Sequence, residues 1–361
     1  MQTNIFSGYF GKCHCQGIAV DPVKGYLYYS FTTKLIKSDL NGNIIGSVDH
    51  IIGHLGCIDF CDRDGKLYAS LEYKNDAVGK GILRALDAKD RSVEDGFYVA
   101  IFDVDRINRP DMDAERDGVM RTVYLKTVVD DYSGKTVNGG RVCEHLYGCS
   151  GIDGLAIGPD FGNPHGTQQY LHVCYGVYSD TERTDNDYQV ILQFEFEDWW
   201  EGIAQPLFQD RMHKNGPKEA RNKYFLYTGN TTYGVQNMEY DAWTGNYFLC
   251  VYPGKKQEFP NYPMFVINGS IAPRREELRG FDTETKGLVL TLQETGVSQN
   301  GIHGMDFPRG STGFYAFGDG RFYVSEEFRS PDTGEQATNV RLYRLLTDGP
   351  TWNFVRYREN A

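Results

Sequence analysis

The sequence has no apolar run approaching the ~20 residues that a membrane-spanning helix needs, so we expect no membrane partner. Its first residues, MQTNIFSGYF, lack the charged-then-apolar order of a secretion signal, which predicts a cytoplasmic protein. Long basic runs are also missing, and 37 Lys and Arg stand against 49 Asp and Glu, a formal net charge of −12. Such a chain cannot neutralise a phosphate backbone, so we expect no nucleic-acid partner.

Several catalytic and metal-binding motifs are missing as well. The sequence contains no GxSxG nucleophile turn and no GxxxxGK phosphate loop, which argues against a serine hydrolase of that type and a P-loop enzyme. Its eight cysteines are scattered, and no CxxC pair recurs at the spacing of a structural zinc site. We therefore expect free thiols and no disulfide framework.

Glycine and aromatic residues are plentiful. The chain has 41 glycines, 25 tyrosines and 21 phenylalanines, a composition typical of many short strands joined by tight turns. The sequence therefore predicts an all-β protein.

One phrase of the form strand, turn, strand recurs five times. The copies are CQGIAVDPVKGYLYYSF from Cys15, GCIDFCDRDGKLYASL from Gly56, DGLAIGPDFG from Asp153, QNMEYDAWTGNYFLCVY from Gln236 and HGMDFPRG from His303. Two more strand-like runs follow most copies, and four strands make one propeller blade. The pattern predicts one β-propeller domain over residues 1–361 with five four-stranded blades, six being the alternative, and a long insertion or irregular blade segment at 77–145.

The first strand of each blade lines the axis of a propeller, so equivalent positions should meet in a ring. Two residues before the first apolar position of the copies stand Gln16, Gly56, Asp153, Gln236 and His303. Oxygen and nitrogen donors of this kind hold divalent cations, so Gln16, Asp153, Gln236 and His303 are candidate ligands for calcium, manganese or zinc. Hydrogen bonding among these groups and channel waters is the equally weighted alternative. No organic cofactor is expected.

The phrase DGLAIG, starting at Asp153, resembles the blade-start phrase of the SMP-30/gluconolactonase/strictosidine-synthase-like β-propellers. The resemblance implies that Asp153 is a metal ligand, because that family places acidic or amide ligands at this strand position. The chain departs from the family in having Gln16 where a glutamate is expected, in lacking the asparagine-containing phrases, and in showing five copies in place of six.

Candidate catalytic residues surround the same mouth. His14 and His54 stand two residues before the axial ring, where either could transfer a proton. The second strand of copy two ends in SLEYKND, which brings Glu72 and Lys74 to this end, and a carboxyl group there could act as acid or base. A solvated strand end is the alternative for this segment.

Lys74 and four further residues are candidates for binding the substrate, and cationic side chains of this kind hold a carboxylate or phosphate. Arg141 and His145 lie on a glycine-rich loop leading to Asp153, and Lys255 and Arg329 follow second strands of later copies.

These features together favour an enzyme acting on a sugar or sugar acid at the propeller axis, by metal-assisted hydrolysis of a lactone or glycosidic bond. A polysaccharide or oligosaccharide lyase with a histidine base is one alternative, and a non-catalytic propeller that binds carbohydrate or protein is another. The expected partner is a small-molecule or oligosaccharide ligand, and the oligomeric state is left open.

Overall fold

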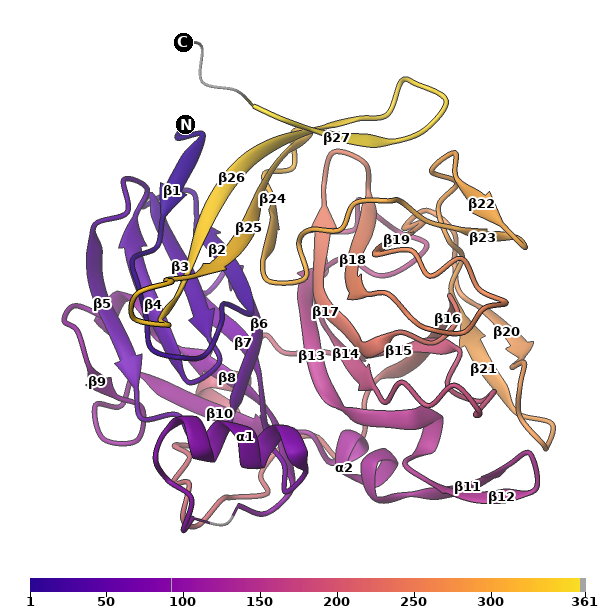
Figure 1. Cartoon of the computed structure of the whole chain (residues 1–361), viewed down its shortest axis with the longest axis horizontal. Coiled ribbons are helices and arrows are strands. Elements are labelled where there is room, and N and C mark those ends of the chain that lie inside the picture. Colours follow the sequence, from indigo (N-terminus) through magenta and orange to yellow (C-terminus); the bar gives the residue numbers. More distant parts are fainter. Residues whose placement is uncertain (92, 358–361) are drawn as a thin grey trace.

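The computed structural model describes residues 1–91 and 93–357 and is a five-bladed β-propeller (Figure 1). The innermost strands of the blades are β2, β6, β13, β17 and β24, and each contacts the next so that β24 meets β2 again. Alternating apolar residues and turns such as VKG and RDG produce these hairpins, with Gly25 and Gly65 at positive φ in equivalent turns. The predicted architecture and the preferred blade number are confirmed.

Blades I and II follow the predicted order along the chain. Blade I contains β2 (Gly17–Asp21), β3 (Tyr26–Phe31), β4 (Lys34–Asp39) and β5 (Ile44–Asp49), with β9 (Met112–Asp113) added at its edge. Blade II contains β6 (His54–Cys61), β7 (Lys66–Tyr73), β8 (Gly96–Phe102) and β10 (Met120–Tyr124).

The expected irregular segment 77–145 supplies two strands of blade II and several additions. Its other elements are α1 (Ala77–Ala85), the 3-10 turn η1 (Val104–Arg106), β9, α2 (Lys126–Ser133) and the hairpin of β11 (Lys135–Asn138) and β12 (Arg141–Glu144). Helix α1 begins at Asp76, whose carboxylate accepts hydrogen bonds from the backbone N–H groups of Val78 and Gly79.

Blades III and IV depart from four strands each. Blade III contains β13 (Cys149–Gly158), β14 (Tyr170–Val177), β15 (Tyr188–Phe194) and β16 (Asn222–Tyr227), extended by β21 (Lys286–Val289) and β20 (Arg274–Glu277). The 3-10 turn η2 (Leu146–Gly148) precedes it, and the short helix α3 (Trp199–Gly202) follows β15. Blade IV contains β17 (Thr232–Asp241), β18 (Asn246–Tyr252) and β19 (Met264–Ile267), and the two-residue strands β22 (Ser298–Gln299) and β23 (Ile302–His303) lie farther along the chain.

Blade V corrects the fifth predicted repeat. Its strands are β24 (Phe314–Ala316), β25 (Arg321–Arg329), β26 (Gln336–Leu346) and β27 (Asn353–Arg356). The phrase from His303 was predicted to be its inner strand, but Met305 donates a backbone hydrogen bond to Met264 O (2.9 Å) and so lies at the outer edge of blade IV. The inner strand is FYA, which pairs with β25 across a turn containing Gly318 and Gly320 at positive φ.

The amino-terminal strand β1 (Asn4–Phe6) closes the ring by pairing with β26, so that Ile5 lies opposite Val340 (Figure 1). Five clusters of buried apolar residues fill the spaces between adjacent blades. For example, Ala19 of blade I packs with Ile58 of blade II, and Ile18 packs in a cluster with Val340 of blade V. Burying such side chains is the main favourable contribution to folding.

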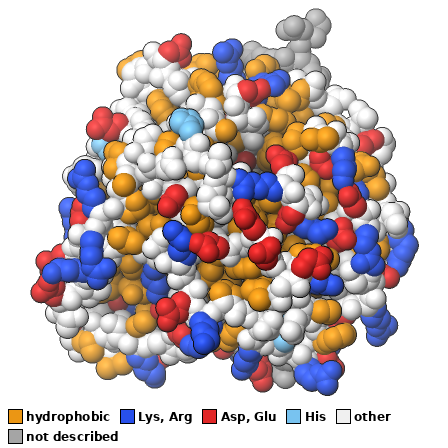
Figure 2. Space-filling model, turned by 180° about the vertical axis from the view of Figure 1, so that it is seen from behind, with side chains coloured by type: hydrophobic (Ala, Val, Ile, Leu, Met, Phe, Trp, Pro, Cys, Tyr) orange, Lys and Arg blue, Asp and Glu red, His pale blue; other side chains and the backbone are white. Residues whose placement is uncertain are grey.

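The surface carries charges of both signs. In the view from behind, acidic and basic side chains alternate over the lower half of the molecule (Figure 2). All eight cysteines are free thiols. Among the described residues, no helix has the length and apolar character needed to cross a membrane.

Candidate functional site

A cavity of about 200 Å³ opens where the inner strands begin, at one end of the propeller axis. Seven of the residues predicted from the sequence line it together: His14, Gln16, His54, Glu72, Lys74, Asp153 and Gln236. The structure therefore brings these seven residues together, while their function as a site and the chemical role of each stay predictions.

A buried ion pair forms one wall of the cavity. Lys74 Nζ lies 2.5 Å from Glu72 Oε1 and donates a hydrogen bond to Ser150 O (2.7 Å). The other oxygen, Glu72 Oε2, accepts a hydrogen bond from the backbone N–H of Ile152 (2.9 Å). Burial opposes the charge on Lys74, but the carboxylates of Glu72 and Asp76 outweigh it and raise the lysine pKa. Lys74 is therefore a fixed positive charge beside the axis.

Asp153 is a second buried carboxyl group of the cavity. Burial, followed by the nearby charge of Glu72, raises its pKa well above the usual value, while Lys74 and the Gln236 amide oppose the shift. Its Oδ1 atom is buried and has no hydrogen-bond partner among the described residues. A carboxyl group with a raised pKa keeps its proton to a higher pH than an exposed aspartate does and can donate it to a ligand.

Glycines in the axial rings make room for the two carboxyl groups. A Cβ atom at Gly56 would lie 2.3 Å from Asp153 Oδ1, and one at Gly151, where φ is +122°, would lie 2.0 Å from Glu72 Oε2. No larger residue fits at either position while the carboxyl groups stay in place. The absence of a side chain at Gly56 and Gly151 therefore makes room for a carboxyl group from a neighbouring blade.

The two histidines differ in their environment. His54 is buried, and burial followed by the positive charge of Lys74 lowers its pKa to about 3. Its Nδ1 lies 3.7 Å from Glu72 Oε1, beyond hydrogen-bond distance, and has no partner among the described residues. His14 is half-buried at the cavity rim, close enough to His54 for a positive charge on it to lower the His54 pKa further. His54 is thus a neutral imidazole, and His14 has access to solvent.

The described residues show no site for the predicted divalent metal, so metal binding is not confirmed. Within residues 1–91 and 93–357, no three His, Cys, Asp or Glu side chains converge as metal ligands would. Asp153 is the single carboxylate among the predicted ligands, and the glutamine amides are held in place through Nε2, which donates to Thr32 Oγ1 (3.2 Å) from Gln16 and to Tyr233 O (3.1 Å) from Gln236. The ammonium group of Lys74 adds a positive charge that repels a second cation.

His303, the fourth predicted metal ligand, lies outside the axial ring. It belongs to β23, which pairs with β22 in a two-stranded sheet, and it does not line the cavity. The axial position in blade V is taken by Thr312, which precedes Gly313 just as Gln16 precedes Gly17. In both blades this glycine lies opposite a serine of the second strand, because Ser325 donates to Gly313 O and Gly17 pairs with Ser30.

The predicted substrate-binding residues Arg141, His145, Lys255 and Arg329 also lie outside the cavity. Arg141 is ion-paired with Glu182 (2.7 Å), and both side chains are more than half exposed. Lys255 and Arg329 are exposed residues at the ends of their segments. Their expected contact with the axial ligand is therefore not supported.

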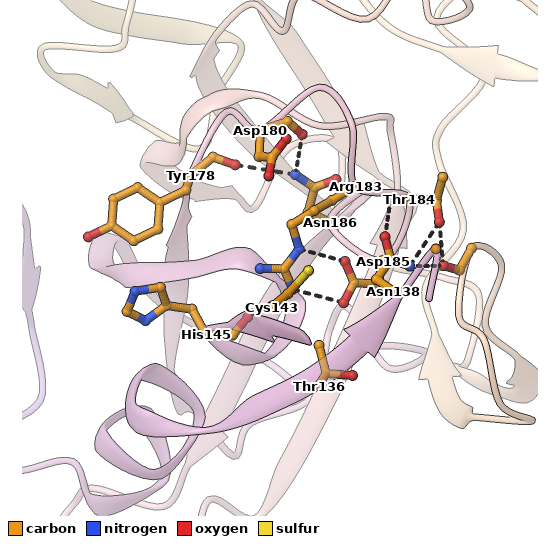
Figure 3. A network of polar contacts seen from close by, with 12 residues as sticks. Thr136, Asn138, Cys143, His145, Tyr178, Asp180, Arg183, Thr184, Asp185 and Asn186 are labelled. Atoms are coloured by element: carbon orange, nitrogen blue, oxygen red, sulfur yellow. Dashed lines mark hydrogen bonds and ion pairs between the residues drawn. The ribbon is translucent and has the colours of Figure 1, made fainter. Parts of the chain in front are cut away.

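His145 helps to hold the hairpin β11–β12 to blade III (Figure 3). Its ring lies between those of Tyr132 and Tyr178, with centroids 4.5 and 5.1 Å away. Its carbonyl accepts a hydrogen bond from Arg183, which is also bound through two nitrogens to Asp185 (2.8 Å each). These contacts hold the loop in place, and His145 therefore stabilises the fold away from the axial cavity.

Sequence reasoning missed two aromatic residues of the cavity. Tyr233 lies at the rim with φ +66°, and Tyr252 is the last residue of β18. The sequence did contain a signal for Tyr252, because it ends the second strand of its blade, and second strands end at this mouth.

A pair of carboxyl groups, Asp59 and Glu239, lies at the level of the turns, toward the opposite end of the inner strands. Burial, with the charge of Asp59, raises the pKa of Glu239 well above its usual value, and burial raises the pKa of Asp59 to about 7. Asp59 Oδ2 accepts from the backbone N–H of Ile157 (2.7 Å), and Glu239 Oε1 accepts from that of Ala316 (2.8 Å). Glu239 therefore keeps a proton when Asp59 is ionised.

Comparison with known proteins adds little. No protein-family model matches the chain and no curated protein matches it, so the resemblance to the SMP-30 family is not confirmed. Among solved structures it is similar to the arabinanase Arb43A of Bacillus subtilis, with 9% identity, coverage of 94% of this chain and 97% of the other, and a TM-score of 0.36. A luciferin-regenerating enzyme matches at 11% identity, 92% coverage of both chains and TM-score 0.36. The PQQ domain of a Coprinopsis cinerea pyranose dehydrogenase matches at 12% identity, with coverage of 90% of this chain and 81% of the other and a TM-score of 0.37. Likenesses at this level say nothing about activity.

Proposed function

We propose that this propeller is a hydrolase that cleaves a lactone or glycosidic bond in a small sugar or sugar acid by acid–base catalysis in the axial cavity. The observation that carries the proposal is the Asp153 carboxyl group, which is buried, has a pKa raised well above its usual value, and has no hydrogen-bond partner at Oδ1 among the described residues. A group in this state protonates a departing oxygen as its bond breaks.

The other cavity residues follow from their environments. Both oxygens of Glu72 are engaged, by Lys74 and by Ile152 N–H, so Glu72 acts as an anchor for the lysine. His54 is too weak a base at a pKa of about 3 and serves as a neutral hydrogen-bonding group. His14 at the rim remains as the base that accepts a proton from the attacking water. The amides of Gln16 and Gln236 and the Lys74 ammonium bind hydroxyl or carboxylate oxygens.

The cavity size restricts the substrate. Sites for drug-sized ligands have volumes of ~300–1,000 Å³. At about 200 Å³ the axial cavity accommodates a single sugar ring, which favours a small substrate over the middle of a polysaccharide.

The test is turnover of a panel of aldonolactones, aryl glycosides and disaccharides by the wild type, Asp153→Asn and Asp62→Asn. We expect hydrolysis by the wild type and a loss of ~10²–10⁴-fold in kcat for Asp153→Asn, the usual range for a general acid. Asp62, an exposed carboxylate near the opposite end of the strands, is the matched control and should retain full activity.

The activity of the wild type should fall as pH rises through the raised pKa of Asp153, because only the protonated carboxyl donates. Binding of a sugar without turnover would indicate a binding propeller instead, and an unsaturated product would indicate a lyase. Equal activity of Asp153→Asn and the wild type would remove the basis of the proposal.

A further inference from the structure

A second hollow adjoins the axial cavity between blades IV and V. It measures about 380 Å³ and is bounded by the end of β18, the segment 308–312 and the middle of β25. Tyr252 lines both this side hollow and the axial cavity, so the two spaces lie on either side of one side chain. Neither the predicted site residues nor the chemistry proposed above uses the side hollow.

The phenol of Tyr252 connects the two spaces electrostatically. Burial, then the charges of Glu327 in the side hollow and Asp153 in the axial cavity, raise its pKa to about 12. Tyr252 therefore keeps its proton throughout the physiological range and can donate a hydrogen bond. A ligand oxygen positioned between Asp153 and the side hollow would lie next to the Tyr252 side chain.

The lining of the side hollow matches a neutral, hydroxyl-bearing ring. Pro253, Pro263 and Pro308 give it rigid apolar surfaces. Three hydroxyl groups, those of Ser311, Thr312 and Ser325, also line it; they are hydrogen-bonded to protein groups and keep lone pairs that accept hydrogen bonds from a ligand. The one guanidinium group, that of Arg309, is ion-paired with Glu326 (2.9 Å), so the hollow offers no uncompensated positive charge to an anion. Apolar faces combined with a few placed polar groups are typical of small-molecule sites.

We propose that the side hollow binds the leaving group of the substrate, so that the substrate consists of two neutral sugar units joined by a glycosidic bond. This inference rests on the proposed function and narrows it from a lactone or glycoside to a glycoside. The reacting ring occupies the axial cavity, and the bond to be cleaved lies beside Tyr252. The two hollows together reach the volume range of ordinary ligand sites, which the axial cavity alone does not.

The reaction balances with water as the only co-substrate. The bond between the anomeric carbon and the bridging oxygen breaks, and the proton of Asp153 moves to that oxygen, which leaves as a hydroxyl group in the side hollow. Water forms the new bond to the anomeric carbon and gives a proton to His14. That proton then returns to Asp153 through solvent, and no oxidant or reductant is needed.

The test measures binding, so that it stands apart from catalysis. Cellobiose, lactose, xylobiose and arabinobiose and their constituent monosaccharides are titrated into the full chain by calorimetry, using wild type, Glu327→Trp and Arg344→Trp. Glu327 is exposed and lines the side hollow, so an indole at this position fills the hollow without disturbing the core. Arg344 is an exposed strand residue outside both hollows and provides the matched control.

We expect at least one disaccharide to bind wild type and Arg344→Trp tenfold or more tightly than its monosaccharides. Glu327→Trp should lose this difference while retaining its affinity for the monosaccharide. Equal affinity for one and two rings, no disaccharide binding, or an equal loss of both in Glu327→Trp would overturn the side-hollow proposal. Failure of the proposed function has a different signature, namely turnover that does not depend on Asp153.

Discussion

Replacing Glu239 by glutamine should make the protein more stable, and the gain should grow with pH. In the folded protein the pKa of Glu239 lies well above 4.5, because the side chain is buried and Asp59 is close. In the unfolded chain the carboxyl group ionises near its ordinary pKa. The unfolded state therefore loses a proton that the folded state keeps. The contribution of Glu239 to the free energy of unfolding has its maximum below about pH 4.5 and declines as pH rises toward the pKa of the folded state.

The upper limit of the effect follows from linkage. One proton of difference changes the free energy of unfolding by about 1.4 kcal/mol per pH unit, so the wild type should lose up to about 2.7 kcal/mol relative to Glu239→Gln between pH 5 and pH 7, the limit being reached when Glu239 stays protonated in the folded protein over this range. Glutamine retains an oxygen that can accept the hydrogen bond from Ala316 N–H, so the contact that Glu239 makes with β24 survives.

The assay is urea unfolding followed by tryptophan fluorescence at pH 5, 6 and 7, with Glu276→Gln as the control. Glu276 is an exposed residue of β20, and its substitution should shift stability by the same small amount at every pH. Parallel pH profiles for wild type and Glu239→Gln would refute the reasoning, since they would mean that Glu239 is ionised in the folded protein.

Two further predictions concern the axial cavity. Lys74→Met should lower the free energy of unfolding by about 3–5 kcal/mol, because it leaves the buried Glu72 carboxylate without its partner. The double variant Glu72→Gln/Lys74→Met should lose much less stability, because it removes both charges. Denaturant titration of the single and double variants measures the coupling. Gly56→Ala should destabilise by about 1–3 kcal/mol because its Cβ would collide with Asp153, whereas Gly81→Ala in α1, where nothing lies within 4 Å, should leave stability equal or higher. Equal thermal midpoints for the two alanine variants would contradict the crowded geometry around Asp153.

The sequence predicted the inner strands of four blades because their apolar alternation and turns recur with little change. Because those strands are equivalent, the sequence predicts that Gln16, Asp153 and Gln236 lie at one mouth. The second strand of blade II ends at the same mouth, which adds Glu72 and Lys74. These residues could be located without coordinates, because a propeller places equivalent positions around one axis.

The fifth repeat could not be located in this way. The phrase from His303 has the apolar spacing of an inner strand, and Met305 and Phe307 do pack between blades IV and V, but from the outer edge of blade IV. Periodicity reports which face of a strand is buried and does not report its distance from the axis. The better signal was Gly313, which stands where Gly17 stands in the first blade.

The loop residues failed for a different reason. Arg141 and His145 precede Asp153 in the chain, but the hairpin of β11 and β12 carries them away from the mouth. The direction of that hairpin depends on the buried Arg183 and Asp185 pair, which comes later in the chain and leaves no local mark near Arg141.

The pairing of β1 with β26 has a consequence for how the protein is made. Ile5 leaves the ribosome 335 residues before its partner Val340. Domains generally fold as units, so the nascent chain can assemble early blades but must keep β1 unpaired until β26 has been translated. A substitution at Ile5 would therefore impair the pairing of β1 with β26 more than the assembly of the early blades, and its effect would be seen in the yield of folded protein released from the ribosome.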